Sequence, residues 1–555
     1  MEKQSLTISH KRCLYGFWLI LVCSFALLHA FHLSADFPNH TPWFMDWAKY
    51  TDEGWYGNAA VRAHLFGNWY LPVDFNPAPA VPVWPFLEWV LFFFTGVSVQ
   101  AARGLAVAFF FCNLLLSYLL LRAKSPRWVA LTALTLLVTS PFLYCFSRLA
   151  ILEPMLIAFT LTTLNLAIRL PRLRRPVWAS IAIGLLFTLM MLTKTTAVFL
   201  LPALGWAMLL PLWHNRKLAC RCVFAAATAF AASFGLWMAL VIHFGLLADF
   251  RYLFFVNKYD KPPEFYWPLV SFWWSFHGGL WVDHVLIPLA FLVILGAILT
   301  GAAWARRRAA GKLADGSSSV GWSDWASKLL LDPVFGASIL AIAGYILFMT
   351  YQNHPQPRYF AVVAFFSFFV VAQGAGALLG QTASWPRRLG WAVVALAALA
   401  AVSNSIQTLS YAAHPEYTFV TAAQRLTQYI DAHPNGRRLL VSLSGDQITM
   451  VSHLPTLCDD FGTPSPLYPD LGTKLELYQP GWWATWNDID PGTLEDLHSH
   501  FSLEQVASFR AFDDSDRNIL VLFKLHPLPG GKARHYEDQD LRVPLPGDKI
   551  DIPVE

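Results

Sequence analysis

The sequence predicts a polytopic α-helical membrane protein with about eleven transmembrane helices and a C-terminal extracytoplasmic α/β domain. Of its 555 residues, 56% are hydrophobic and 14% are charged, with a mean hydropathy of +0.43. Soluble proteins average about 45–50% apolar and about 25% charged residues. The apolar residues also gather in runs of about 18 or more, the length of a membrane-spanning helix. These observations exclude an ordinary soluble enzyme, a disordered chain and a nucleic-acid-binding protein.

The first apolar run covers residues 14–33 and follows Lys11 and Arg12. A basic start before an apolar run is also typical of a signal peptide. This run is longer than the about 7–15 apolar residues of such a peptide, and no clean small-residue cleavage site follows it. We therefore expect it to be retained as the first span.

Further apolar segments follow along the chain. Ten have the character of spans, and they lie at 104–121, 128–145, 149–168, 177–193, 196–213, 222–244, 284–304, 334–351, 359–380 and 389–407. One more, 84–99, is short, begins near Pro82 and Pro85 and carries Glu88. We interpret it as a helix that lies along the membrane surface or re-enters it.

The distribution of basic residues favours eleven crossings over twelve. With eleven spans and a cytosolic N-terminus, the cytosolic segments hold about twice as many lysines and arginines as the outer loops, which is the usual bias of membrane proteins. If 84–99 also crossed, every later loop would change side and most basic residues would lie outside. Eleven spans give a long first outer loop, 34–103, and place the C-terminal part outside.

The more polar C-terminal part predicts a second folded unit. Within it, 418–433 has a helical pattern, whereas 437–444 and 518–525 are rich in the aliphatic residues of strands. The predicted units are a transmembrane domain at 1–407, a small extracytoplasmic α/β domain at 408–530 and a flexible tail at 531–555.

No motif in the sequence predicts a metal or nucleotide site. The seven cysteines lack zinc-ligand spacing and do not form an even disulfide set. There is no P-loop and no glycine-rich dinucleotide motif. The outer carboxylates could hold a divalent cation, but no pattern in the sequence fixes one.

Carboxylates near the membrane surface are the first candidates for chemistry, because an ionisable side chain within a bilayer costs on the order of 2.5–3.5 kcal/mol. Asp52 and Glu53 begin a helical stretch in the first outer loop, and Glu153 follows an outer turn. Each also has a structural alternative. Asp52 and Glu53 can stabilise a helix N-terminus, and Glu153 can form an ion pair with Arg148.

Cations lie on the same predicted side. Arg148 and Lys194 occupy outer turns, and Arg358 enters a later span beside Tyr359, shortly after His354. A snorkelling lysine or an interface anchor is the structural alternative. Guanidinium and ammonium groups pair with phosphate oxygens, and a carboxylate can remove a proton from a hydroxyl group. Together these residue types fit transfer of a sugar from a lipid phosphate.

On these residues the chain resembles the GT-C superfamily of polyprenyl-phosphate-sugar glycosyltransferases, in particular the lipid A aminoarabinose transferases and the protein O-mannosyltransferases. The likeness extends over roughly 35–410. It is carried by four outer segments in order, which are Asp52-Glu53-Gly with Arg62 and Gly67-Asn-Trp-Tyr70, then Arg148 with Glu153-Pro, then Thr193-Lys194, and finally Pro357-Arg358-Tyr359. Superfamily members have a first loop with helices along the membrane, as expected here for 84–99.

The resemblance implies inverting transfer of a glycosyl group from a polyisoprenyl-phosphate donor to an extracytoplasmic lipid, polysaccharide or protein. It implies a bacterial plasma membrane, an outward-facing site, and donor, acceptor and membrane lipids as partners, without nucleic acid. The implied catalytic residues are Asp52 as general base, Glu53 and Glu153. The implied donor-phosphate ligands are Arg148, Lys194, Arg358, Tyr359 and His354.

Other functions remain possible on sequence alone. A lipid-linked-sugar transporter or flippase would need ionisable residues near the bilayer midplane. A ligase that uses a lipid-diphosphate donor is a closer alternative, and a non-catalytic scaffold would leave these charges without a shared site. Residues 76–82 lack the acid and lysine that aminoarabinose transferases carry there, so the sugar and the acceptor stay open.

Overall fold

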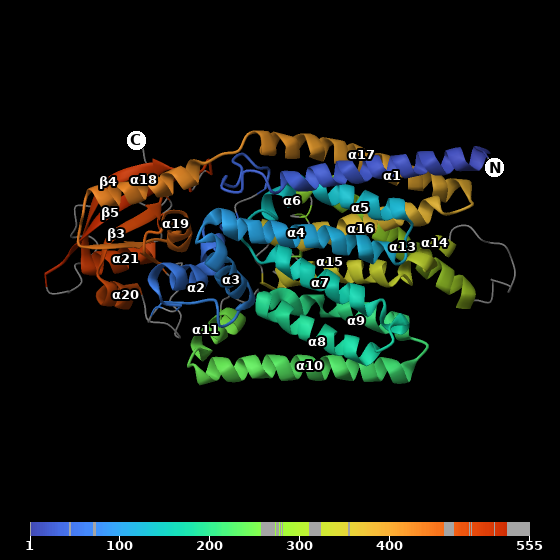
Figure 1. Cartoon of the computed structure of the whole chain (residues 1–555), viewed down its shortest axis with the longest axis horizontal. Coiled ribbons are helices and arrows are strands. Elements are labelled where there is room, and N and C mark those ends of the chain that lie inside the picture. The colour runs from blue at the N-terminus through green and yellow to red at the C-terminus, as the bar shows by residue number, and fades with distance from the viewer. Residues whose placement is uncertain are drawn as a thin grey trace.

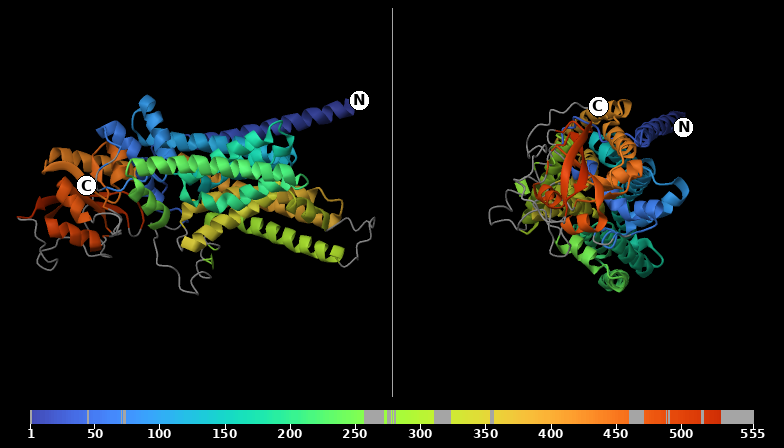
Figure 2. Two further views of the ribbon diagram at one scale, coloured as in Figure 1. Left: turned by 90° about the horizontal axis from the view of Figure 1, so that it is seen from below. Right: turned by 90° about the vertical axis from the view of Figure 1, so that its left-hand side faces the viewer.

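The protein is elongated, with a helical bundle at one end and a small sheet at the other (Figure 1). This computed structural model describes residues 2–43, 46–69, 71, 74–256, 272–273, 277, 279, 281–309, 323–352, 356–459, 471–487, 489, 491–514 and 517–529. The N-terminus lies at the end of the bundle that is remote from the sheet (Figures 1 and 2). This arrangement confirms a helical membrane domain followed by a C-terminal α/β domain.

Eight helical stretches among the described residues are long and apolar enough to cross a bilayer. They are α4 (Val99–Arg122), α8 (Pro176–Thr193), the run η3, α9 and η4 (Thr195–Leu200, Leu201–Leu209 and Leu210–Leu212), α10 (Arg216–His243), α13 (Leu286–Ala309), α15 (Pro333–Gln352), η6 with α16 (Pro357–Tyr359 and Phe360–Leu379) and α17 (Ser384–Ala413). The other bundle helices have shorter apolar stretches. They are α1 (Glu2–Leu28, apolar from Cys13), α5 (Arg127–Thr139), α6 (Pro141–Phe146), α7 (Glu153–Ala167) and α14 (Ser323–Leu330), and η2 (Leu170–Arg172) is a short 3-10 turn. Each of the eleven expected spans contains a helix, and the number of crossings stays a prediction.

Helix α16 forms the centre of the bundle. Its sequence is apolar on every side, a pattern typical of a helix surrounded by other helices, and 83% of its span is buried. Helix α10 is the opposite case, with 6% of its span buried. It packs mainly on α8, where the absence of a side chain at Gly184 lets the α10 backbone approach closely at Ala226.

The first outer loop forms η1 (Trp47–Lys49), α2 (Asp52–Phe66) and α3 (Val83–Thr95), between the bundle and the sheet (Figure 1). The 13 residues of α3 give about 20 Å of helix, too short for about 30 Å of hydrocarbon. This length agrees with the expectation that 84–99 does not cross. Helix α3 packs on α2, where the buried side chain of Glu88 lies directly against Gly57. Later in the chain, α11 (Leu247–Arg251) and the π-helical turn η5 (Tyr252–Val256) follow α10.

The C-terminal domain is a five-stranded mixed sheet with helices on both faces. Its elements are α18 (Thr418–Ala432), β1 (Arg437–Val441), α19 (Gly445–Ser452), β2 (Thr456–Leu457), α20 (Leu471–Tyr478), β3 (Pro480–Trp486), α21 (Pro491–His500), β4 (Phe501–Arg510) and β5 (Ile519–Pro527). The strand order is β2-β1-β3-β5-β4, with β2, β1 and β3 parallel and β5 antiparallel to β3 and β4.

Two apolar cores cover the faces of this sheet. Phe419 and Leu426 of α18 pack with Trp482 on one face, and Leu475 and Leu494 pack with other strand residues on the opposite face. The helix predicted at 418–433 and the strands predicted at 437–444 and 518–525 are confirmed, with slightly different ends. The domain boundaries at 407 and 530 stay predictions, and the predicted tail at 531–555 lies outside the described residues.

Candidate functional site

Five charged side chains come together where the first outer loop meets the outer ends of the bundle helices. They are Asp46, Asp52, Glu153, Lys194 and Arg358, and each is between 1 and 6% exposed. Every one occupies a helix end or a turn. Asp46 caps η1, Asp52 begins α2, Glu153 begins α7, Lys194 ends α8, and Arg358 lies in η6. We call these five residues the outer charge cluster.

Arg358 lies between two carboxylates of the first outer loop. Its Nη1 is 2.6 Å from Oδ1 of Asp46, and its backbone N–H donates to Oδ2 of the same residue at 2.7 Å. Its Nε lies 3.1 Å from Oδ2 of Asp52. Asp46 also accepts a hydrogen bond from the backbone N–H of Ala48 at 2.7 Å, which fixes the start of η1. The guanidinium group therefore links η6 to the whole turn that precedes α2.

Lys194 is the second cation of the cluster. Its Nζ forms an ion pair with Glu153 and lies 4.9 Å from the ring centre of Tyr359. The guanidinium carbon of Arg358 lies 4.8 Å from the same ring. Cations within about 6 Å of an aromatic face are attracted to it. Lys194 and Arg358 both lie within this distance of the Tyr359 ring.

Burial raises the pKa of Asp52 above the usual range of aspartate, although the nearby Arg358 opposes this shift. A raised pKa makes the carboxylate a better proton acceptor than an exposed aspartate. Asp52 is thus a buried carboxylate that is paired with Arg358 and has a raised affinity for a proton.

Glu53 faces away from this cluster. It accepts hydrogen bonds from Arg103 Nε and Nη2 at 2.7 and 2.6 Å, in a bidentate ion pair. The backbone N–H of Ala150 also donates to it, at 2.9 Å. Successive helical residues point about 100° apart, so the sequence neighbours Asp52 and Glu53 serve different partners. The structure gives Glu53 the geometry of a structural ion pair between α2 and α4.

Arg148 is also separate from the cluster. Its Nη2 donates to the carbonyl oxygens of Phe31 and His32 at 2.5 and 2.7 Å, and its Nη1 bonds to the hydroxyl of Tyr144. These contacts hold the chain that leaves α1. The expected partner Glu153 is instead paired with Lys194. His354 lies outside the described residues.

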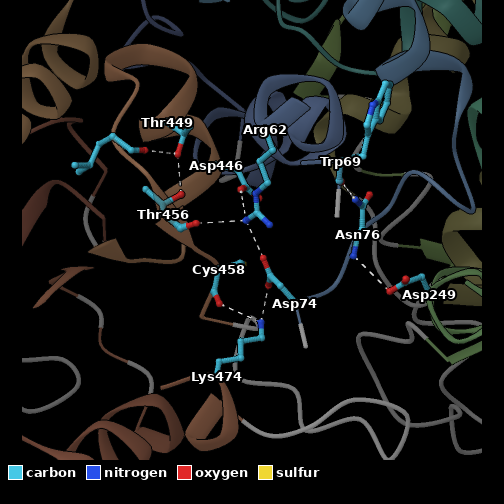
Figure 3. A network of polar contacts seen from close by, with 11 residues as sticks. Arg62, Trp69, Asp74, Asn76, Asp249, Asp446, Thr449, Thr456, Cys458 and Lys474 are labelled. Carbon is cyan, nitrogen blue, oxygen red and sulfur yellow. Dashed lines mark hydrogen bonds and ion pairs between the residues drawn. The ribbon is translucent and has the colours of Figure 1, made fainter. Parts of the chain in front are cut away.

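A second buried charged network joins the first outer loop to the C-terminal domain (Figure 3). Asp74 pairs with Arg62 Nη2 at 2.8 Å and with Lys474 Nζ at 2.7 Å. Arg62 also reaches Asp446 at 3.5 Å. Burial raises the pKa of Asp446 to about 6, with Arg62 opposing that shift. These ion pairs connect the first outer loop to the C-terminal domain. Arg62, which belongs to the sequence motif, therefore contacts Asp74 of the loop and Asp446 of that domain.

In the described part of the chain, the carboxylates of the outer charge cluster are paired with cations. In this part of the chain, no three histidine, cysteine, aspartate or glutamate side chains are grouped as metal ligands. Asp46 and Asp52 face Arg358, and Glu153 faces Lys194.

Three residues of this region were not among the expected site residues. Asp46 was detectable as a further acid in the same outer loop, six positions before Asp52. Arg103 and Gln447 gave no local signal, because their roles depend on contacts with Glu53 that are distant in sequence.

We expect Glu53→Gln to destabilise the protein rather than remove one catalytic step. Arg103 would keep a buried charge without its full partner, which typically costs about 3–5 kcal/mol. Thermal unfolding in detergent tests this, with Asp431→Asn as the matched control. The pair between Asp431 and Arg438 is about half exposed, and such pairs contribute about 0–1 kcal/mol. Equal unfolding temperatures for both variants would contradict the structural role of Glu53.

Comparisons with known proteins bear on the whole fold. The family model of dolichyl-phosphate-mannose-protein mannosyltransferases matches residues 77–239. The apo oligosaccharyltransferase of Archaeoglobus fulgidus is similar in structure, with a TM-score of 0.50 and 12% identity, over 93% of this chain and 75% of that chain. ArnT from Cupriavidus metallidurans bound to undecaprenyl phosphate has a TM-score of 0.45 and 14% identity, over 93% and 99% of the two chains. No curated protein matches the sequence.

The family match covers one segment of the chain, whereas the shared fold extends over nearly all of it. The matched segment runs from the end of the first outer loop through α10 and contains Glu153 and Lys194. The similarity to the archaeal oligosaccharyltransferase extends over nearly the whole chain. The chain is therefore a polytopic membrane protein that shares the fold of the archaeal oligosaccharyltransferase, and its residues 77–239 match the mannosyltransferase family model.

Proposed function

We propose that the protein transfers a sugar, with inversion, from a polyisoprenyl-phosphate donor to an acceptor on the outer side of a bacterial plasma membrane. The outer charge cluster carries this proposal, because it sets a buried base, Asp52, beside Arg358 and close to Lys194. The matching family is named for a lipid-phosphate-linked mannose donor, which supports the donor class. The sugar and the acceptor are not specified by these observations.

Lys194 and Arg358 would bind the donor phosphate. Ammonium and guanidinium groups form strong charge-assisted hydrogen bonds with phosphate oxygens. In the structure both cations already face carboxylates, so the donor phosphate would replace part of these contacts rather than add a charge to an unpaired pocket. Because the phosphate leaves as an anion, the cations would stabilise the charge that develops on it in the transition state.

Asp52 would act on the acceptor. As the bond between the sugar and the phosphate breaks, the acceptor hydroxyl attacks the anomeric carbon from the opposite side, and Asp52 takes its proton. Inversion in one displacement needs a single base, whereas a retaining route needs a second carboxylate as nucleophile. Glu153 would keep its ion pair with Lys194 and so hold the ammonium group in position.

Asp52→Asn should abolish transfer while leaving the fold intact. Loss of a general base typically costs about 10²- to 10⁴-fold in rate, and asparagine retains the shape and one oxygen acceptor. Purified protein in lipid is incubated with a panel of undecaprenyl-phosphate sugars and acceptors, and release of undecaprenyl phosphate is measured. Asp431→Asn is the control. Turnover of Asp52→Asn near the wild-type rate would remove Asp52 as the base.

The rate of transfer should fall as the pH is lowered. The base is active as the carboxylate, so protonation inactivates it, and the raised pKa of Asp52 places this loss at a higher pH than for an exposed aspartate. The measurement is the pH dependence of kcat for undecaprenyl phosphate release by the wild type. A rate that rises with acidity would contradict the assignment.

Lys194→Ala and Arg358→Ala should mainly weaken use of the donor. Each removes a hydrogen-bonded cation, an interaction of about 1.5–3 kcal/mol, so the donor concentration for half saturation should rise roughly tenfold or more. A double variant, Glu153→Gln with Lys194→Met, controls for the unpaired glutamate left by the single change. Unchanged donor saturation in both single variants would contradict the phosphate-binding role.

A further inference from the structure

The turn that carries Asp46 and Asp52 has two sides. One side faces Arg358 of the bundle. The other side faces the C-terminal domain, where Lys49 forms an ion pair with Asp514. The neighbouring Tyr50 is completely buried in the core of that domain, and its ring centre lies 5.3 Å from that of Trp486. The segment that precedes the base is thus embedded in the C-terminal domain.

Gln447 of the C-terminal domain contacts this turn on both sides of Asp52. Its Nε2 donates to the backbone carbonyl oxygen of Lys49 at 3.2 Å and to Oε2 of Glu53 at 3.3 Å. The side chain is 3% exposed. One amide group therefore joins a residue three positions before the base to the residue directly after it.

The helix that bears Gln447 is itself fixed against α2. A side chain at Gly54 would overlap the backbone of Asp446 and Gln447, so α19 lies in direct contact with the first turn of α2. Arg62, two turns further along α2, reaches Asp446 (Figure 3). These contacts fix the position of Gln447 relative to the first two turns of α2.

We propose that Gln447 is a positioning residue of the transferase, acting on Asp52 through the turn formed by η1 and the start of α2. This inference rests on the proposed function, in which Asp52 is the base. A displacement of about 1 Å at a reacting group can cost about 10²-fold in rate. The C-terminal domain is then a structural part of the catalytic site, whatever acceptor it meets.

The test is Gln447→Met in the full-length protein, which removes both hydrogen bonds and keeps the volume of the side chain. The kcat for undecaprenyl phosphate release should fall about 10- to 100-fold, and the KM for the donor should stay within about twofold, because Lys194 and Arg358 are not contacted by Gln447. Looser packing of Asp52 against Arg358 should also move the acid inflection of kcat to higher pH. The matched control is Gln428→Met, at an exposed position in α18 of the same domain, which should behave as the wild type.

A second variant covers the case in which Gln447→Met fails to fold. Asp514→Asn removes the ionic partner of Lys49 at a side chain that is 32% exposed, and should lower kcat in the same way but less. Wild-type kcat and an unchanged pH inflection in the folded variants would overturn the positioning role, as would a change confined to the donor KM. Normal turnover by Asp52→Asn would instead overturn the proposed function, so the two failures are distinguishable.

Discussion

The outer end of the bundle depends on one guanidinium group that is removed from water and held by two carboxylates. Desolvation of a charge costs several kcal/mol and is recovered only when the geometry is good and the remaining donors are satisfied. Arg358 recovers part of this cost through its hydrogen bond to Asp46 and its ion pair with Asp52, although its Nε has no hydrogen-bond partner among the described residues. Because both acids come from the first outer loop, the same contacts that stabilise the arginine also fold η1 and the start of α2 onto the bundle. The same ion pairs therefore form the candidate site and hold the first outer loop on the bundle.

Two adjacent acids show how the site is divided. Asp52 pairs with Arg358, and Glu53 pairs with Arg103. The first turn of α2 therefore contacts the outer charge cluster with one residue and the structural ion pair with α4 with the next. Gln447 then ties Glu53 to the C-terminal domain. The proposed catalytic residue and the attachment of the C-terminal domain share one short segment. Gly54 and Gly57 of this segment allow α19 and α3 to approach α2 closely.

Much of this arrangement follows from local sequence patterns. Apolar runs predicted the bundle helices, and the proline-bounded 84–99 predicted α3 as a helix that does not cross. The aliphatic runs at 437–444 and 518–525 predicted β1 and β5. By contrast, β3 contains three tryptophans and two glycine or proline positions, which give no alternation because both of its faces are buried. Strand β4 was missed since its burial is irregular along its length.

The candidate site was only partly predictable for a related reason. Asp52, Glu153, Lys194, Arg358 and Tyr359 could be found as costly or unusual residues on one side of the membrane, and the structure brings them together. Which of these charged residues form ion pairs with one another could not be predicted from the sequence. Lys194 rather than Arg148 is the partner of Glu153, and the choice depends on how α7, α8 and the chain after α1 pack. Glu153 and Lys194 are 41 residues apart, and Asp46 and Arg358 are 312 apart. Contacts between segments so far apart leave no periodicity in the sequence.

These long separations have a consequence for biosynthesis. Asp46 and Arg358 are 312 residues apart, and Asp74 and Lys474 are 400 residues apart. At about 5–20 residues per second, the first outer loop waits about 20–80 s for its last partner to leave the ribosome. Until then the charged residues of the loop lack the distant partners that hold the loop in its final conformation. Under the proposed mechanism, a nascent chain that is already inserted in the membrane would therefore lack a complete site until the C-terminal domain has been exported and folded.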